Sequence, residues 1–156
     1  MKAIKFEESI LVDRPPELVF DFTQDYGKRL LWDTFLKRAD LMDGADSAGK
    51  GVKAYCVARN GLAMTTEYLT FNRPEVTAIK MTKGPFMFKS FLGSWRFKSE
   101  GSGRTEVKFL YSFTLRFPFS LLSGVIKQNL MKNVQQRLTD LKGHIEQGPK
   151  RSDFLP

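Results

Sequence analysis

The last third of the chain constrains the fold most. Residues 107–117 alternate polar side chains with large apolar ones, which predicts a strand with one aromatic face. Residues 120–147 follow directly and place apolar side chains at steps of three or four, which predicts one long amphipathic helix. Such a helix can cross a whole sheet, so strand and helix together would enclose a deep apolar interior. We expect that interior to be the site of function.

The rest of the chain predicts an antiparallel sheet. We expect a first strand at residues 2–13, a helix from Pro15 to about Gln24 and a short helix near Lys28–Thr34. Period-two patterns predict six more strands, at Lys37–Asp43, Gly51–Arg59, Leu62–Asn72, Glu75–Lys83, Phe88–Glu100 and Arg104–Phe117. The predicted fold class is α+β, with a curved sheet of about seven strands and the long carboxy-terminal helix across it. A single domain is expected at residues 1–148, followed by a short tail at 149–156.

Composition limits the class of protein. The chain has 156 residues and 14 Phe, a high count, so many rings must be buried or line a cavity. No stretch has the length of apolar sequence needed to span a bilayer and no signal core is evident, so we expect a cytoplasmic protein. With Cys56 as the only cysteine and His144 as the only histidine, we expect no disulfide, no transition-metal site and no cofactor.

Three stretches of the sequence resemble a known superfamily. Residues 10–20 run from a strand through two prolines into a helix, residues 25–33 continue into a second helix, and residues 93–107 form a late hairpin. Together they resemble the START-like (SRPBCC) superfamily with its helix-grip fold, in the polyketide cyclase/dehydrase-like branch. The resemblance covers nearly the whole chain and implies an internal cavity that binds a small hydrophobic ligand. It identifies the fold better than the reaction.

Strand parity predicts which side chains face the helix. The aromatic faces of the last two strands must be interior, which places Arg96, Lys98, Lys108 and Arg116 on the outer surface. In the last helix the basic residues, Arg137 among them, lie off the apolar stripe. The residues expected to line the cavity are Trp32, Phe35, Cys56, Met64, Thr66, Tyr68, Met81, Phe91, Trp95, Phe109, Tyr111, Phe113, Ile126, Leu130 and Val134. The alternative is that these side chains simply fill the core.

The expected interior contains few polar groups. Thr66, Tyr68, Tyr111 and the indole N–H of Trp95 supply them, a composition that suits a hydrophobic ligand oriented by a few hydrogen bonds. Tyr68 and Tyr111 are the candidates for catalysis, with Asp33 or Glu67 as further groups that could reach the chamber.

Two apolar segments fall where loops are expected. They contain Phe86 and Phe88 between two strands, and Phe117 and Phe119 before the last helix. Loop tips are normally polar, so these segments either fold back to cap the chamber or form a gate that touches a membrane. If they form a gate, the net charge of +8 favours contact with a membrane whose surface is anionic.

Three functions remain open at this point. The shortage of ionisable groups in the interior favours a binder or carrier of a lipid-like or polyketide-like molecule over a cyclase or dehydratase that uses the cavity tyrosines. The third is a protein-interaction module that uses the basic outer face of the sheet. Nucleic acid is not expected as a partner, because the chain has no basic arm and no nucleic-acid-binding motif, and we expect a monomer or homodimer.

Overall fold

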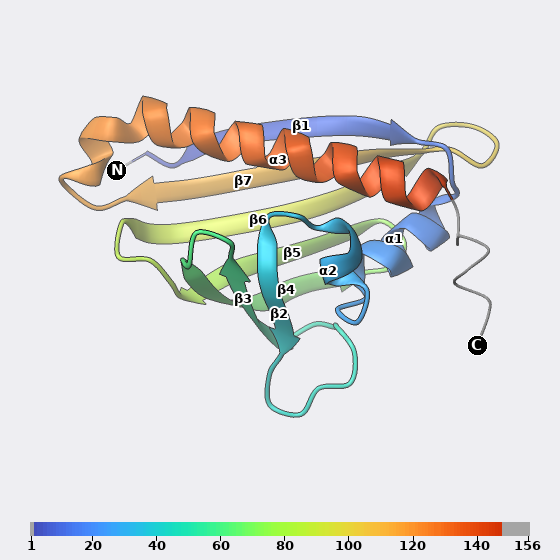
Figure 1. Cartoon of the computed structure of the whole chain (residues 1–156), viewed down its shortest axis with the longest axis horizontal. Helices are drawn as coiled ribbons and strands as arrows, with labels where there is room; N and C mark the ends of the chain where they lie inside the picture. Colours follow the sequence, from blue (N-terminus) through green and yellow to red (C-terminus); the bar gives the residue numbers. More distant parts are fainter. Residues whose placement is uncertain (1, 148–156) are drawn as a thin grey trace.

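The chain forms one curved antiparallel sheet with a long helix lying along its β1 side (Figure 1). The computed structural model describes residues 2–147. The expected tail at 149–156 therefore lies outside the described residues. In chain order the elements are β1 (Ile4–Val12), α1 (Pro16–Gln24), α2 (Arg29–Trp32), β2 (Leu36–Leu41), β3 (Lys53–Ala58), β4 (Ala63–Asn72), β5 (Val76–Lys83), β6 (Phe88–Ser99), β7 (Thr105–Leu115), the 3₁₀ turn η1 (Phe119–Leu122) and α3 (Ser123–Glu146).

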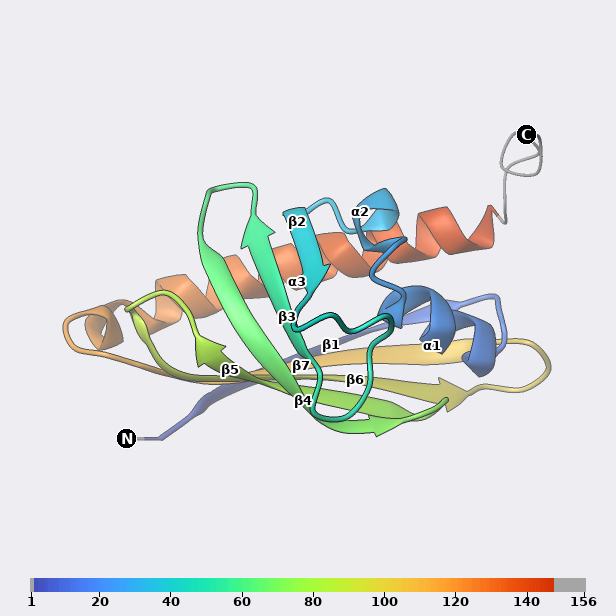
Figure 2. The same ribbon diagram turned by 90° about the horizontal axis from the view of Figure 1, so that it is seen from below.

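The first strand of the sheet pairs with the last one in the sequence. The strand order is β1-β7-β6-β5-β4-β3-β2, and every neighbouring pair is antiparallel. Consecutive strands are neighbours except for β1, which pairs with β7 in a register that places Ile4 opposite Phe113. The two short helices follow β1 and precede β2 in the sequence, and they cover one end of the concave face (Figure 2). The predicted fold class is confirmed.

The two halves of α3 differ in how deeply they are buried. Val134, Leu138, Leu141 and Ile145 in the second half are buried against the core of β1, β6 and β7. In the first half, Ile126 and Leu130 are only partly buried. Since the backbone of α3 packs mainly on β1, its first half stands away from β3, β4 and β5. This separation leaves room inside the fold.

The boundaries of α3 differ from the prediction at its beginning. A helix was expected from residue 120, but the chain after Pro118 first makes the 3₁₀ turn η1, in which the N–H of Leu121 donates to the Pro118 carbonyl over 3.0 Å. Such a tightened turn is common at helix ends. None of the described helices is long and apolar enough to cross a membrane.

Candidate ligand-binding site

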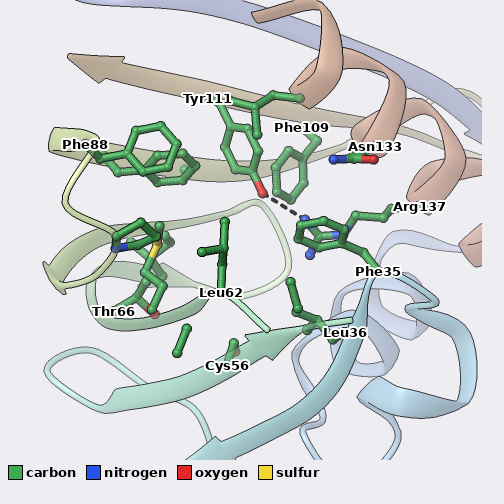
Figure 3. Close-up of a pocket in the computed structure, with 18 of the residues that line it drawn as sticks. Phe35, Leu36, Cys56, Leu62, Thr66, Phe88, Phe109, Tyr111, Asn133 and Arg137 are labelled. Atoms are coloured by element: carbon green, nitrogen blue, oxygen red, sulfur yellow. Dashed lines mark hydrogen bonds between the residues drawn. The ribbon is translucent and has the colours of Figure 1, made fainter. Parts of the chain in front are cut away.

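A cavity of about 350 Å³ lies between the first half of α3 and the concave face of β3 to β7. Figure 3 shows side chains from both sides pointing into it. Its walls are mainly apolar: Leu36, Leu62, Met64, Met87, Phe88, Phe91, Trp95, Phe109, Ile126 and Leu130. A volume of this size is at the lower end of the range for sites that hold small organic ligands.

Most of the side chains expected at the cavity do line it. These are Phe35, Cys56, Met64, Thr66, Tyr68, Phe91, Trp95, Phe109, Tyr111, Ile126 and Leu130. Trp32, Phe113 and Val134 are instead almost completely buried in the closed core, and Met81 is partly buried beside that core. Parity identifies the inward face of a strand or helix, but it cannot say whether an inward side chain meets space or packed atoms.

The four expected gate residues separate into two groups. Phe86 and Phe117 are 70% and 73% exposed. Phe88 is buried and forms part of the cavity wall, and Phe119 packs partly buried against the core. Phe88 faces inward although it lies three residues before Phe91, because the pairing of β6 with β7 shifts register between Phe88 and Ser90.

A buried cluster of charges forms one end of the cavity. The Asp33 carboxylate, completely buried, accepts hydrogen bonds from Arg137 Nε at 3.0 Å, Arg137 Nη2 at 2.8 Å and Arg29 Nε at 2.8 Å. Arg29 and Arg137 are each 6% exposed, and both line the cavity. The Arg137 guanidinium carbon lies 5.0 Å from the ring centre of Phe35 and 5.4 Å from that of Phe109.

All three members of this cluster are ionised at neutral pH. Burial opposes the charge of Asp33, but the positive charges of Arg137 and Arg29 and their hydrogen bonds outweigh it and lower the pKa of Asp33 to about 2. Burial likewise opposes the charge of Arg29, and the neighbouring carboxylate outweighs it, so the pKa of Arg29 is raised. Two guanidiniums against one carboxylate give the cluster a net charge of one positive unit.

Three tyrosines complete the polar end. Tyr111 accepts a hydrogen bond from Arg137 Nη1 over 2.8 Å, drawn as a dashed line in Figure 3. Tyr68 donates to Gln24 Oε1 over 2.7 Å, so in its 3.3 Å contact with Tyr26 it is the acceptor. Burial raises the pKa of Tyr26 and raises that of Tyr68 well above its usual value, so both hydroxyls stay protonated at neutral pH.

Sequence reasoning missed the two arginines. Arg137 was placed off the apolar stripe of the last helix, yet it is buried between stripe residues because Asp33, from a segment far away in the sequence, reaches it. One available signal was the i, i+4 spacing of Arg29 and Asp33 around Trp32, which favours an ion pair on one helical turn. Asp33, named as a group that could reach the chamber, lies behind the two arginines, and Glu67 is not among the lining residues.

The opposite end of the cavity is apolar and leads to the surface. Pro85, Met87 and Val125 line it, and the two apolar loops meet there. Arg116 joins these loops, since its Nη1 donates to the carbonyls of Phe86 at 2.9 Å and Phe88 at 2.6 Å. The exposed side chains at this end, here called the apolar tip, are Phe86, Phe117, Leu121, Leu122 and Val125.

No cluster of three or more potential metal ligands occurs within residues 2–147. His144 stacks on Phe22, with ring centres 5.8 Å apart, and is not among the residues that line the cavity.

Comparison with known proteins shows the family and the fold. Residues 3–146 match the family described as "Polyketide cyclase / dehydrase and lipid transport". The Zhui aromatase/cyclase from Streptomyces sp. R1128 has the same fold at 15% identity, with a TM-score of 0.81 over 96% of this chain and 98% of that one. The major latex-like protein 151 from Panax ginseng is similar at 13% identity, with a TM-score of 0.72 over 92% of this chain and 98% of that one. No curated protein sequence matches the chain.

Proposed function

Because the chain belongs to the polyketide cyclase/dehydrase and lipid transport family, we propose that it binds a small hydrophobic ligand in the cavity beneath α3. The observation that carries the proposal is the composition of the cavity wall. Apolar side chains form most of it, and the ionised and hydroxyl groups gather at one end. A ligand with an apolar body and one polar end matches this arrangement.

The proposal is tested by filling the cavity. Thr66 lines it from the middle of β4, and a phenylalanine at this position would occupy the space of the ligand while suiting a strand. We expect Thr66→Phe to weaken binding of the neutral fluorescent probe N-phenyl-1-naphthylamine by at least about tenfold, with no loss of thermal stability. Leu69→Phe is the matched control, because Leu69 is exposed and does not line the cavity.

A wild-type protein that binds neither this probe nor any small molecule from its own host would overturn the proposal. Native mass spectrometry of the chain purified from that host measures the second point directly. Such an outcome would favour a filled chamber and a protein partner on the basic outer face of the sheet.

We also propose that the ligand enters and leaves at the apolar tip and that this tip contacts anionic membrane. Five large apolar side chains are exposed there, next to the apolar end of the cavity. Residues 76–99 and 107–139, which include both loops and the first half of α3, contain no Asp or Glu but ten Lys or Arg, of which Arg137 is buried. Apolar side chains that insert between lipids, held by basic groups on the surface, describe a carrier of lipid-like molecules.

A second candidate function is a cyclase or dehydratase reaction. The observation that favours it is the hydrogen bond from Arg137 to the Tyr111 hydroxyl at the end of an apolar chamber. Such a positively charged pair can polarise a ligand carbonyl as an enolate forms. The high pKa of Tyr68 speaks against that residue as a general base, because a base must first lose its proton.

Tyr111→Phe separates the two functions. For an enzyme that acts on a linear poly-β-ketone thioester, we expect turnover to fall by about a hundredfold while probe affinity changes less than about threefold. Tyr55→Phe is the control, since Tyr55 does not line the cavity. Absence of any turnover by the wild-type chain, with probe binding intact, leaves the carrier as the function.

A further inference from the structure

Within the charged cluster, the hydrogen bonds leave donor groups free to meet a ligand. Tyr111 accepts from Arg137, so its own O–H is left to donate. Both oxygens of Asp33 are engaged by the arginines. Arg29 lines the cavity, and its Nη2 has no hydrogen-bond partner within residues 2–147 and keeps some accessible surface.

The positive charge of the cluster is only partly balanced. The single carboxylate is shared by two guanidiniums, and the stacked rings of Phe35 and Phe109 offset only part of the remaining positive charge. A buried charge without a partner is costly, and an anion that enters this end would remove the cost.

We propose that the ligand of this cavity carries a single negative charge on oxygen, as in a carboxylate, and that Arg29, Arg137 and Tyr111 bind that group. The proposal rests on the proposed function and adds the chemical class of the ligand: an amphiphilic monoanion whose apolar body extends from the charged end toward Met87 and Val125. Asp33 is a positioning residue in this arrangement, because it holds both guanidiniums without touching the ligand.

Two probes with the same ring system test the proposal. N-phenyl-1-naphthylamine is neutral, and 1-anilinonaphthalene-8-sulfonate adds one negative charge to the same skeleton. We expect the wild-type chain to bind the anionic probe about ten- to a hundredfold more tightly, the range for a hydrogen bond to a charged group. The preference should persist at high salt, because salt screens buried charges much less than exposed ones.

A pair of variants assigns the preference to the cluster. Arg29→Met makes the cluster neutral while Asp33 keeps both bonds from Arg137, so we expect the anionic probe to lose its advantage over the neutral probe. Arg96→Met removes the same charge from the exposed outer face of β6 and should change neither affinity. Arg29→Lys keeps the charge and should retain most of the preference.

The outcomes separate this inference from the proposed function. Equal binding of both probes by the wild-type chain would overturn the inference and leave the proposed hydrophobic cavity in place. This comparison does not depend on whether any variant folds. Binding of neither probe would overturn both. If Arg96→Met reduces the preference for the anionic probe as much as Arg29→Met does, the preference comes from the overall charge of the protein. That result would overturn the assignment to the cluster.

Discussion

Asp33 is the residue on which the charged end of the cavity depends. Its carboxylate is completely buried and fixes the guanidiniums of α2 and α3 at the same point. Removal of one member of a buried ion cluster leaves the others without compensation, which is far more damaging than breaking an exposed pair.

Asp33→Asn should lower the free energy of unfolding by about 3 to 5 kcal/mol, because two positive charges then remain buried without a carboxylate. Chemical denaturation at neutral pH measures the change. Asp21→Asn is the control: the Asp21–Arg73 pair, at 2.7 Å, is more than half exposed, and its loss should have little effect. Equal effects of the two substitutions would contradict the special position of Asp33.

The same residue predicts how stability depends on pH. The pKa of Asp33 is lowered from 3.8 to about 2 on folding, so the unfolded chain binds a proton first as the pH falls. The contribution of Asp33 is complete above about pH 4 and is lost between about pH 4 and pH 2. Melting curves across this window should show the wild-type chain losing more stability than Asp33→Asn, and parallel curves would argue against the shift.

At the scale of elements, α3 combines two roles in one helix. Its second half packs against the core, while its first half stands off from the sheet and forms the cavity wall and part of the apolar tip. The connection from β7 is joined to the β5–β6 loop through Arg116, so the two apolar loops are held together at the entrance.

Replacing two rings of the apolar tip tests its contact with membrane. Phe86→Ser combined with Phe117→Ser should reduce binding to vesicles of phosphatidylcholine and phosphatidylglycerol by at least about tenfold, because both rings are exposed and available for insertion. Co-sedimentation measures the bound fraction, and vesicles of phosphatidylcholine alone should bind the wild-type chain weakly. Leu31→Ser, on α2 and 62% exposed, should have no effect; a decrease as large as that of the double variant would argue against the tip.

At the scale of the whole molecule, the features that follow from local sequence patterns could be predicted, and those that depend on distant residues could not. The order of strands and helices follows from period-two and period-three-to-four patterns and from turn residues, each of which depends on a few neighbours. The apolar wall of the cavity follows from the same parity. The burial of Arg137 depends on Asp33, which lies 104 residues away, and no local pattern carries that information.

The pairing of β1 with β7 has a consequence for synthesis on the ribosome. Ile4–Val12 is made before β2 to β6, whereas its hydrogen-bonding partner Thr105–Leu115 is made after them. During translation β1 must wait with its backbone unpaired while β2 to β6 can already form hairpins with their neighbours in sequence. The sheet is therefore completed only when β7 has emerged, and until then β1 is the strand most in need of protection from wrong partners.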